Sequence, residues 1–356
     1  MPREPRFPVG LRPILLLALA ILLVLAGCRK QEQQSTPPRP TLRENLTLCH
    51  GSVTNLLPRI ALENGYFAAE GLELTVKDLN DGRQALDGLL RGDCHFAVCG
   101  APPITLHDPR SAAFTILASI LSDDDSAKII GRQDRGILGP QDLQGKRIGV
   151  KQGIIGHLFL DLYLMKHGLS PQAVTQVNLE PDRFLPALES GEIDGFSMTN
   201  RLVRQAAQAL GSQATVLAEP GLNLIHGILT TRADLPNGLA AAPALLRALL
   251  RAEEFVKANP NGAKAIIANA HDLSAEELTD LWARTRIEVR LSPDLLVNLD
   301  DQYRWQVGRG VAPALPQPPN YLELVRPEIL AAIRPGAVSI LARSSERRQT
   351  PSPERP

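Results

Sequence analysis

Short apolar runs alternate with amphipathic segments along most of this 356-residue chain, and this alternation limits the possible folds more than any other feature. In the first series, strands are predicted at residues 46–49, 72–76 and 95–99, with helices at 55–64 and 84–91 between them. Parallel strands need long crossover connections, which are usually helices. The first series therefore predicts a parallel sheet with helices on its faces.

A second series of the same kind begins after the acidic run Asp123-Asp124-Asp125. It predicts a strand, a helical turn, a strand, a helix, a strand, a helix and a strand at residues 127–131, 141–144, 147–150, 155–167, 174–179, 183–190 and 195–198. The stretches 89–96 and 188–196 echo each other, because each contains a helix end, a glycine, an acidic residue and a strand. Shared turn physics or duplication would produce this echo, and both fit two lobes of like architecture.

The pattern changes in the C-terminal part of the chain. One more strand is predicted at residues 224–230, and helices follow at about 242–258, 261–270, 274–284 and 294–308. Leucines at positions 245, 246, 249 and 250 form an apolar stripe of helical spacing. We expect these helices to return to the first lobe and cover it.

The N-terminus has the order of a secretory signal. Arginines at positions 3, 6 and 12 precede an apolar run of 13 residues, Ile14 to Ala26, which is shorter than the roughly 20 residues of a membrane-spanning helix. The run ends in Leu25-Ala26-Gly27-Cys28, which resembles a bacterial lipobox. That resemblance implies a lipoprotein signal peptide over 1–27 and acyl chains on Cys28 that hold the protein on a bilayer. An ordinary secretory peptide is the alternative, and both export the chain.

Composition limits the partners of the chain. Residues 28–43 and 344–356 are polar and proline-bearing, which predicts a flexible tether and a disordered tail.

Lys plus Arg and Asp plus Glu number 38 each, and only 4% of residues are aromatic. Nucleic acid is therefore not an expected partner, since neither a basic surface nor a base-stacking platform is indicated.

Three cysteines remain after Cys28: Cys49, Cys94 and Cys99. An oxidising compartment permits one disulfide with one thiol left over. All three lie in apolar, strand-like segments, where cysteine is commonly a small buried residue. We expect burial, and the sequence leaves open whether two of them pair.

Several segments together resemble the periplasmic binding proteins for nitrate, taurine and alkanesulfonates, a family that also includes pyrimidine-precursor binders of thiamine metabolism. The matching pieces are Pro58, Asn64 to Leu72, Asp142 to Val150, Ala187 to Gly195 and Phe255 to Pro260. Their order and spacing over about residues 46–330 carry the resemblance.

The resemblance implies an α/β, two-lobed type II periplasmic-binding-protein fold, with two doubly wound sheets joined by two hinge crossings. Lobe one would comprise 44–122 plus 221–343, and lobe two 123–220. The implied function is the extracytoplasmic solute-binding component of an ABC importer, which captures a small anion or related molecule in the inter-lobe cleft. We accordingly expect a lipid-anchored monomer in the cell envelope that meets an ABC permease of the inner membrane, catalyses nothing, and has no cofactor.

Open parallel sheets bind ligands beyond the carboxyl ends of their strands, and hinged lobes close on a ligand. The expected ligand-binding residues are therefore Ser52, Asn55, Gly100, Ala101, Gly153, Ile154, Ile155, His157, Thr199, Asn200 and His226. Ser52 and Asn55 also suit a purely capping role. Family members often have small hydroxyl residues where Ile154 and Ile155 stand, so this departure favours a partly apolar ligand over nitrate or a simple sulfonate. Arg201 would pair with an anionic ligand or lie on a solvated helix face.

The histidines and cysteines show no spacing typical of a zinc site or a catalytic pair, so we expect no metal and no catalytic residue. Two other functions remain open. One is a pyrimidine-synthase-like enzyme of the same fold. The other is a ligand-sensing lipoprotein that presents its closed state to a membrane receptor.

Overall fold

The computed structural model of the chain describes residues 45–51, 56–79, 81–232, 234, 238–271 and 273–340. The expected signal peptide, lipidation site Cys28, tether and tail lie outside the described residues, as do Ser52 and Asn55. Among the residues described, none of the helices combines the length and the apolar character needed to cross a membrane.

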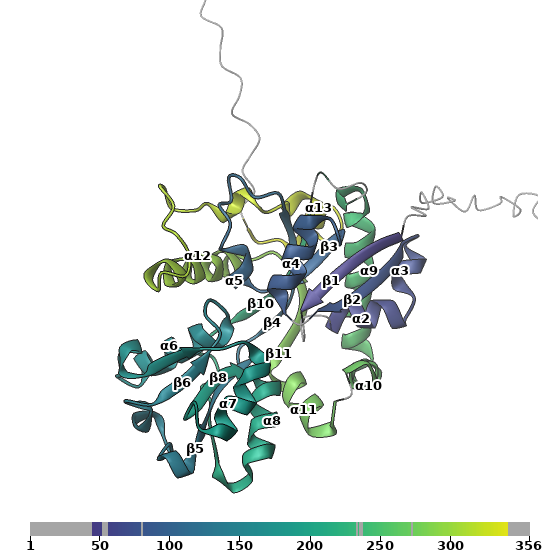
Figure 1. Ribbon diagram of the computed structural model, residues 1–356. Coiled ribbons are helices and arrows are strands. Elements are labelled where there is room, and N and C mark those ends of the chain that lie inside the picture. Colours follow the sequence, from purple (N-terminus) through teal and green to yellow (C-terminus); the bar gives the residue numbers. More distant parts are fainter. Residues whose placement is uncertain are drawn as a thin grey trace, which may run out of the picture. The chain divides into compact units, whose positions relative to one another are not determined.

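Two separate β-sheets organise the described chain (Figure 1). The six-stranded sheet has the order β11-β4-β10-β3-β1-β2, and the five-stranded sheet has the order β7-β6-β8-β5-β9. The first contains β1 (Asn45–Gly51), β2 (Glu73–Leu79), β3 (Phe96–Cys99), β4 (Thr115–Asp123), β10 (Ile225–Thr231) and β11 (Thr285–Arg290). The second contains β5 (Ala127–Arg132), β6 (Arg147–Val150), β7 (Thr175–Asn178), β8 (Gly195–Thr199) and β9 (Ala214–Leu217). We call the first sheet with its helices lobe one and the second with its helices lobe two.

Each sheet combines parallel and antiparallel strands. Strands β2, β1 and β3 are parallel, whereas β10, β4 and β11 join them in antiparallel pairs. In lobe two, β7, β6 and β8 are parallel, and β5 and β9 add antiparallel pairs. The predicted α/β fold with two sheets is confirmed, and the predicted parallel pairing holds for three strands of each sheet. Strands β4, β9 and β11 escaped the sequence pattern.

The chain crosses between the sheets twice, from β4 to β5 and from β9 to β10. These two crossings are hydrogen-bonded to each other, because the Gly221 N–H donates to the Asp124 carbonyl over 2.9 Å. Strands β4 and β10 pair side by side, with the Asp123 end of β4 opposite the Ile225 end of β10. Both crossings therefore leave lobe one at the same edge of its sheet.

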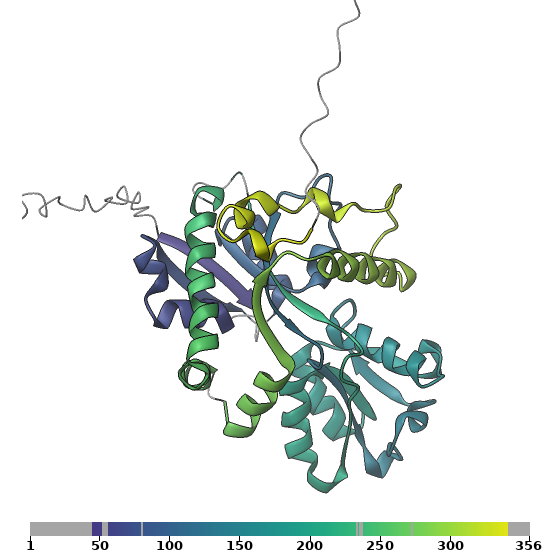
Figure 2. The ribbon, with the colours of Figure 1, turned by 180° about the vertical axis from the view of Figure 1, so that it is seen from behind.

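One continuous core fills lobe one and includes residues from Leu46 to Ile340. Its helices are α2 (Leu56–Glu63), α3 (Tyr66–Ala69), α4 (Gly82–Arg91), α5 (Ala101–Ile104), α9 (Gly238–Ala258), α10 (Pro260–His271), α11 (Ala275–Arg284), α12 (Pro293–Gly308) and α13 (Pro327–Ala331). Seen from behind in Figure 2, the long helix α9 runs across the strands of this lobe. Leucines of α9 and α12 are buried in the same cluster as β1, so the C-terminal helices belong to lobe one.

Lobe two has helices on both faces of its sheet: α6 (Ile155–Lys166), α7 (Phe184–Ser190) and α8 (Asn200–Leu210). One cluster packs α6 on one face through Phe159 and Leu160, and another packs α7 and α8 on the other face. In the second cluster the rings of Phe184 and Phe196 stack with centroids 5.1 Å apart. Helices on both faces are what the predicted doubly wound sheet requires.

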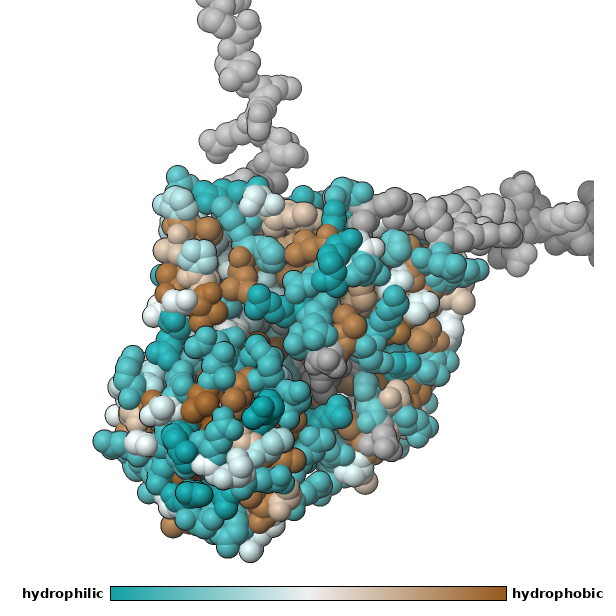
Figure 3. All heavy atoms as spheres, in the orientation of Figure 1, coloured by the Kyte–Doolittle hydropathy of each residue, from teal (hydrophilic) through white to brown (hydrophobic). Residues whose placement is uncertain are grey.

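Short 3₁₀ turns complete the secondary structure at Gln133–Arg135, Pro140–Leu143, Pro171–Ala173, Pro181–Arg183, Gly211–Gln213, Tyr321–Glu323 and Pro335–Ala337. Figure 3 shows one face of the molecule, where hydrophilic residues dominate and apolar residues occur in small groups.

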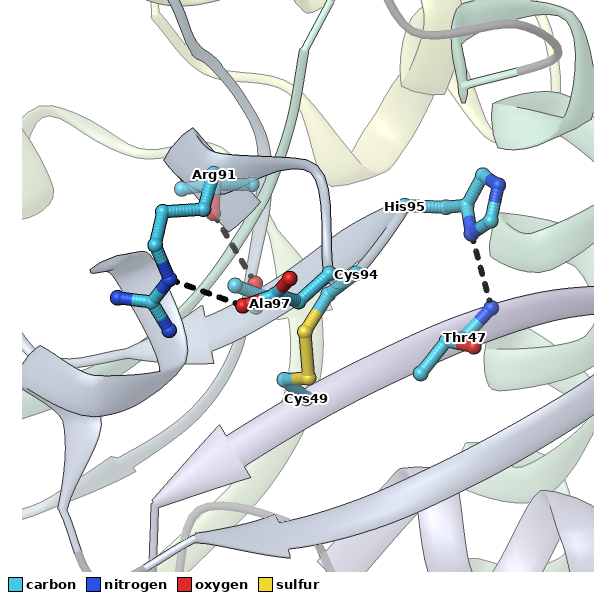
Figure 4. Close-up of a disulfide and its surroundings, with 8 residues drawn as sticks. Thr47, Cys49, Arg91, Cys94, His95 and Ala97 are labelled. Carbon is cyan, nitrogen blue, oxygen red and sulfur yellow. Dashed lines mark hydrogen bonds and ion pairs between the residues drawn. A yellow bond between two sulfur atoms is a disulfide. The ribbon is translucent and has the colours of Figure 1, made fainter. Parts of the chain in front are cut away.

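A disulfide joins Cys49 on β1 to Cys94, two residues before β3 (Figure 4). The expected burial of all three cysteines is confirmed, and Cys49 and Cys94 are the two that pair. The reason is the parallel pairing of β1 with β3, which brings residues 45 positions apart into contact. Cys99 remains a buried free thiol, and its burial raises the pKa of the thiol above its usual value.

Candidate ligand-binding site

The carboxyl ends of the parallel strands lead directly into most of the predicted ligand residues. Gly100 and Ala101 follow β3 and open α5, and the segment from Gly153 to His157 follows β6 and opens α6. Thr199 ends β8, and Asn200 begins α8. His226 lies instead within β10, at the start of lobe one's returning strand.

The first turn of α6 has backbone donors and no side-chain cap. Ile154 occupies the N-cap position, where its side chain can accept nothing. The N–H groups of Ile155 and Gly156 consequently have no hydrogen-bond partner within the described part of the chain. Free N–H groups and the positive end of the helix dipole together make this turn suited to an anion.

Two glycines allow α6 to start where it does. Gly153 has φ +79°, a left-handed conformation that other residues adopt at a cost. Gly156 lies so close to β8 that a Cβ atom there would be 2.3 Å from the Ser197 carbonyl oxygen. The uncapped turn is therefore held directly against the end of β8.

Ser197, near the carboxyl end of β8, adds a polar group to the site. Ser197 is fully buried, and its hydroxyl has no hydrogen-bond partner among the described residues. Ser197 pairs with Ile129 across the sheet, and Ile129 belongs to the core cluster beneath α6, so the Ser197 side chain faces α6 too. A buried hydroxyl without a partner is costly unless something binds it.

His157 positions the loop that precedes α6. Its Nδ1 accepts a hydrogen bond from the Gly153 N–H over 3.2 Å, so the proton of the neutral ring is on Nε2. Burial lowers the pKa of His157, and the nearby charge of Asp161 opposes this change. The imidazole is therefore neutral at pH 7 and acts as a support rather than as a cation.

Helix α8 also begins without a side-chain cap, at Thr199. Asn200 is buried and tied to the first crossing, because its backbone N–H donates to Ser126 and its amide N–H to the Asp125 carbonyl. Asn200 thus anchors α8, while its amide oxygen has no partner in the described chain. Arg201, the next residue, is exposed. The pKa of His271, on α10 of lobe one, is lowered mainly by burial, and the positive charge of Arg201 lowers it further.

The residues from lobe one offer fewer donors. Pro102 and Pro103 occupy the first turn of α5 and have no N–H, so Ala101 is the donor left there. A Cβ atom built on Gly100 would lie about 4 Å from the Ile225 side chain and from the His226 carbonyl oxygen, so Gly100 lies beside both. His226 is fully buried, and its Nδ1 lies 3.0 Å from the Ser119 hydroxyl. His226 therefore belongs to the packing between β4 and β10.

Among the residues that the structure describes, no three His, Cys, Asp or Glu side chains gather as metal ligands. Two lobes joined by two crossings, with uncapped helix N-termini at the strand ends, define the class of the protein: it has the type II periplasmic-binding-protein fold. This class makes a small-molecule site between strand ends the expected feature.

The family follows from the sequence comparison. The model described as "NMT1/THI5 like" matches residues 57–263, more than half of the chain, and the chain belongs to this family. The family resemblance inferred from the sequence is confirmed.

Individual relatives agree with this assignment. A protein of Brucella abortus (strain 2308), whose name gives it as a candidate binding protein, is 24% identical over 267 residues, covering 68% of this chain and 82% of its own. The alkanesulfonate-binding protein SsuA of Xanthomonas axonopodis pv. citri, solved with bound MOPS, is 19% identical with a TM-score of 0.64, covering 79% of this chain and 98% of its own. The desulfurization enzyme DSZB, solved as a mutant with biphenyl-2-sulfinic acid, is also 19% identical, with a TM-score of 0.60 and coverages of 82% and 99%. Together the family, the relatives and the fold support a solute-binding function.

Proposed function

We propose that this protein is the extracytoplasmic solute-binding component of an ABC importer, and that its ligand has an anionic head group on a partly apolar body. The observation that carries the proposal is the first turn of α6. There, the N–H groups of Ile155 and Gly156 have no partner in the described chain, and Gly156 packs against the backbone of Ser197, whose buried hydroxyl also has no partner among the described residues. Two backbone N–H groups and one hydroxyl are thus three hydrogen-bond donors for an anion.

The apolar part of the ligand is inferred from the side chains beside these donors. Ile154 and Ile155 are half-buried, so each keeps apolar surface that a ligand would cover. Each methylene that a ligand buries there contributes about 0.8 kcal/mol, or roughly a fourfold gain in affinity. An alkanesulfonate with several methylenes fits these donors and this surface better than nitrate or taurine. The binding of MOPS, a sulfonate, by a protein of the same fold supports the choice of head group.

The importer role also predicts where the protein works. We propose export through the N-terminal signal, acylation of Cys28 and contact with a permease in the inner membrane. Metabolic labelling with a fatty acid would test the anchor, because Cys28→Ser should abolish the label and release the protein from the membrane fraction.

Calorimetric titration of the purified protein with ethane-, butane- and hexanesulfonate tests the ligand class. We expect Kd to fall with chain length by roughly fourfold per methylene. Butylamine and butanol serve as matched compounds without the anionic head group and should not bind. Absence of binding by every sulfonate would refute the proposed ligand class.

Ser197→Ala tests the site itself, because it removes one hydroxyl with little change in volume. We expect the variant to bind butanesulfonate about tenfold more weakly, the loss of roughly one hydrogen bond to a charged group. Ser190→Ala is the matched control, because the Ser190 hydroxyl bonds within its own helix end to the Ala187 carbonyl. Equal affinities of both variants and the unchanged protein would place the ligand elsewhere.

An enzyme of the same fold is the second candidate, since DSZB shares the fold. Mass spectrometry of the ligand after prolonged incubation distinguishes the two functions. A binding protein returns the sulfonate unchanged, whereas an enzyme releases a product.

A further inference from the structure

A helix of lobe one is fastened to a helix of lobe two by a buried carboxylate. Asp161 on α6 has a side chain that is 1% exposed. Its Oδ2 accepts a hydrogen bond from the indole N–H of Trp305 on α12 over 2.8 Å and lies 3.0 Å from Nε of Arg309. Both of these partners of the lobe-two charge come from lobe one.

A second residue of lobe two strengthens this contact. Gln176 on β7 donates to Oδ1 of Asp161 over 2.9 Å, and its own oxygen accepts from Arg309 over 2.9 Å. The carboxylate thus has partners on both oxygens, and Arg309 forms an ion pair with Asp161 and a hydrogen bond with Gln176. Removing a partner from such a buried charge is costly, because the charge would be left desolvated without compensation.

A second polar contact between the lobes, also among the described residues, is more exposed. Arg204 on α8 pairs with Glu277 and Asp280 on α11, and these three side chains are 29%, 26% and 33% exposed. Ion pairs in contact with water contribute little to stability because water competes for both charges. The contact around Asp161 is therefore the stronger polar connection of the two.

This contact is linked to the first turn of α6. The ring of His157 packs edge-on against the ring of Trp305, with centroids 4.8 Å apart, while its Nδ1 holds the Gly153 N–H. A Cβ atom at Gly153 would lie 2.8 Å from Val311, which follows α12. The first turn of α6 and the loop before it therefore both lie against lobe one.

Helix α12 is in turn fixed to the strand-end segment of lobe one. Gln306, the neighbour of Trp305, is fully buried and bonds to the Thr105 hydroxyl and the Pro102 carbonyl at α5. A movement of α12 would therefore carry α5 with it.

We infer that Asp161, Gln176, His157, Trp305 and Arg309 form an inter-lobe latch, which holds the lobes against each other and couples the α6 turn to α12. The holding role rests on the geometry alone. The coupling to a ligand rests on the proposed function.

Distances between spin labels test the holding role in ligand-free protein. Labels at Arg83→Cys in lobe one and Glu189→Cys in lobe two lie on exposed positions. A Cys28→Ser background suits them, because Cys99 is buried and the other two cysteines are disulfide-bonded. We expect Asp161→Asn to shift the distance distribution, with the ratio of latched to unlatched molecules falling about tenfold or more.

Asp300→Asn is the matched control, because Asp300 forms an exposed pair with Arg304 on the same helix. It should leave the distribution unchanged. Trp305→Phe removes the N–H donor while keeping an aromatic ring, so it provides a second variant if Asp161→Asn does not fold. Distributions of folded Asp161→Asn and Trp305→Phe that superimpose on that of the unchanged protein would overturn the latch.

Fluorescence tests the coupling. The chain has two tryptophans, so Trp282→Phe leaves Trp305 as the single reporter. We expect saturating butanesulfonate to shift its emission maximum, and Asp161→Asn to abolish that shift while binding persists. Bound butanesulfonate without a spectral shift would overturn the coupling, whereas failure of butanesulfonate to bind would overturn the proposed ligand class. The ligand-free distances decide the latch in either case.

Discussion

Nδ1 of His226 lies 3.0 Å from the hydroxyl oxygen of Ser119, between the two strands that lead into the crossings. His226 is fully buried, and its Nε2 is 3.5 Å from a carboxylate oxygen of Asp294, which Arg290 also pairs with. Burial lowers the pKa of His226 to about 4, although Asp294 acts in the opposite direction. A neutral imidazole is therefore part of the packing between β4 and β10.

This pKa predicts how stability depends on pH. The unfolded chain protonates His226 near its usual pKa of 6.5, but the folded chain does so only near 4. The unfolded state therefore binds more protons between these values, and the free energy of unfolding should fall as the pH drops from 6.5 to 4. The contribution of this residue is on the order of 3 kcal/mol.

Urea unfolding of the unchanged protein and of His226→Gln at pH 7.5, 5.5 and 4.5 measures that contribution. The variant should show a weaker pH dependence. His107→Gln is a suitable control, because His107 is a less buried histidine in the same lobe, and burial lowers its pKa too. Parallel pH curves for the unchanged protein and His226→Gln would contradict the assignment.

Gly156→Ala should displace the first turn of α6 from β8, since its Cβ would meet the Ser197 carbonyl oxygen at 2.3 Å. We expect a loss of about 1–3 kcal/mol in the free energy of unfolding and weaker sulfonate binding. Gly308→Ala on α12 is the control, because a Cβ atom there meets nothing within 4 Å. That change should be neutral or slightly stabilising. Thermal unfolding and calorimetry give both quantities, and an unchanged Gly156→Ala protein would show that the close approach is not rigid.

Ile154→Ser places a hydroxyl at the uncapped N-cap of α6. The hydroxyl should accept the free N–H groups of the first turn, which adds about 1 kcal/mol of capping, offset by a similar loss of apolar burial. We therefore expect nearly unchanged stability but a higher Kd for butanesulfonate, because the donors are occupied. Ile154→Val lacks the hydroxyl and should retain affinity. Tighter binding by the serine variant would indicate that the hydroxyl contacts the ligand instead.

The disulfide between Cys49 and Cys94 closes a loop with a sequence separation of 45. Replacing both cysteines by alanine should lower the free energy of unfolding by about 2–4 kcal/mol, because the unfolded chain gains freedom. Dithiothreitol should destabilise the unchanged protein and leave the double variant unaffected. Peptide mapping of unreduced protein identifies the bond, and a Cys49–Cys99 or Cys94–Cys99 peptide would contradict this pairing.

The strand and helix series of both lobes could be predicted because local pattern decided them. Gly65, Gly92 and Gly191 follow predicted helices and have φ values of 68°, 86° and 78°, as helix ends with left-handed glycines require. Strand β4 gave no such signal, because all nine of its residues are buried and they lack alternation. Strand β11 also escaped prediction, because its six residues carry three charges and directly follow helix α11.

The sequence by itself determined the alternation of elements, the family and the uncapped start of α6, since each depends on residues that are neighbours in the chain. Only the tertiary structure decided that Ser197 lies beneath that turn, that Cys94 pairs with Cys49 rather than Cys99, and that Trp305 donates to Asp161. Trp305 and Asp161 are 144 positions apart in the sequence. Such contacts follow from how sheets pair and how lobes pack, and burial in that packing gives a carboxylate or a hydroxyl its energetic weight.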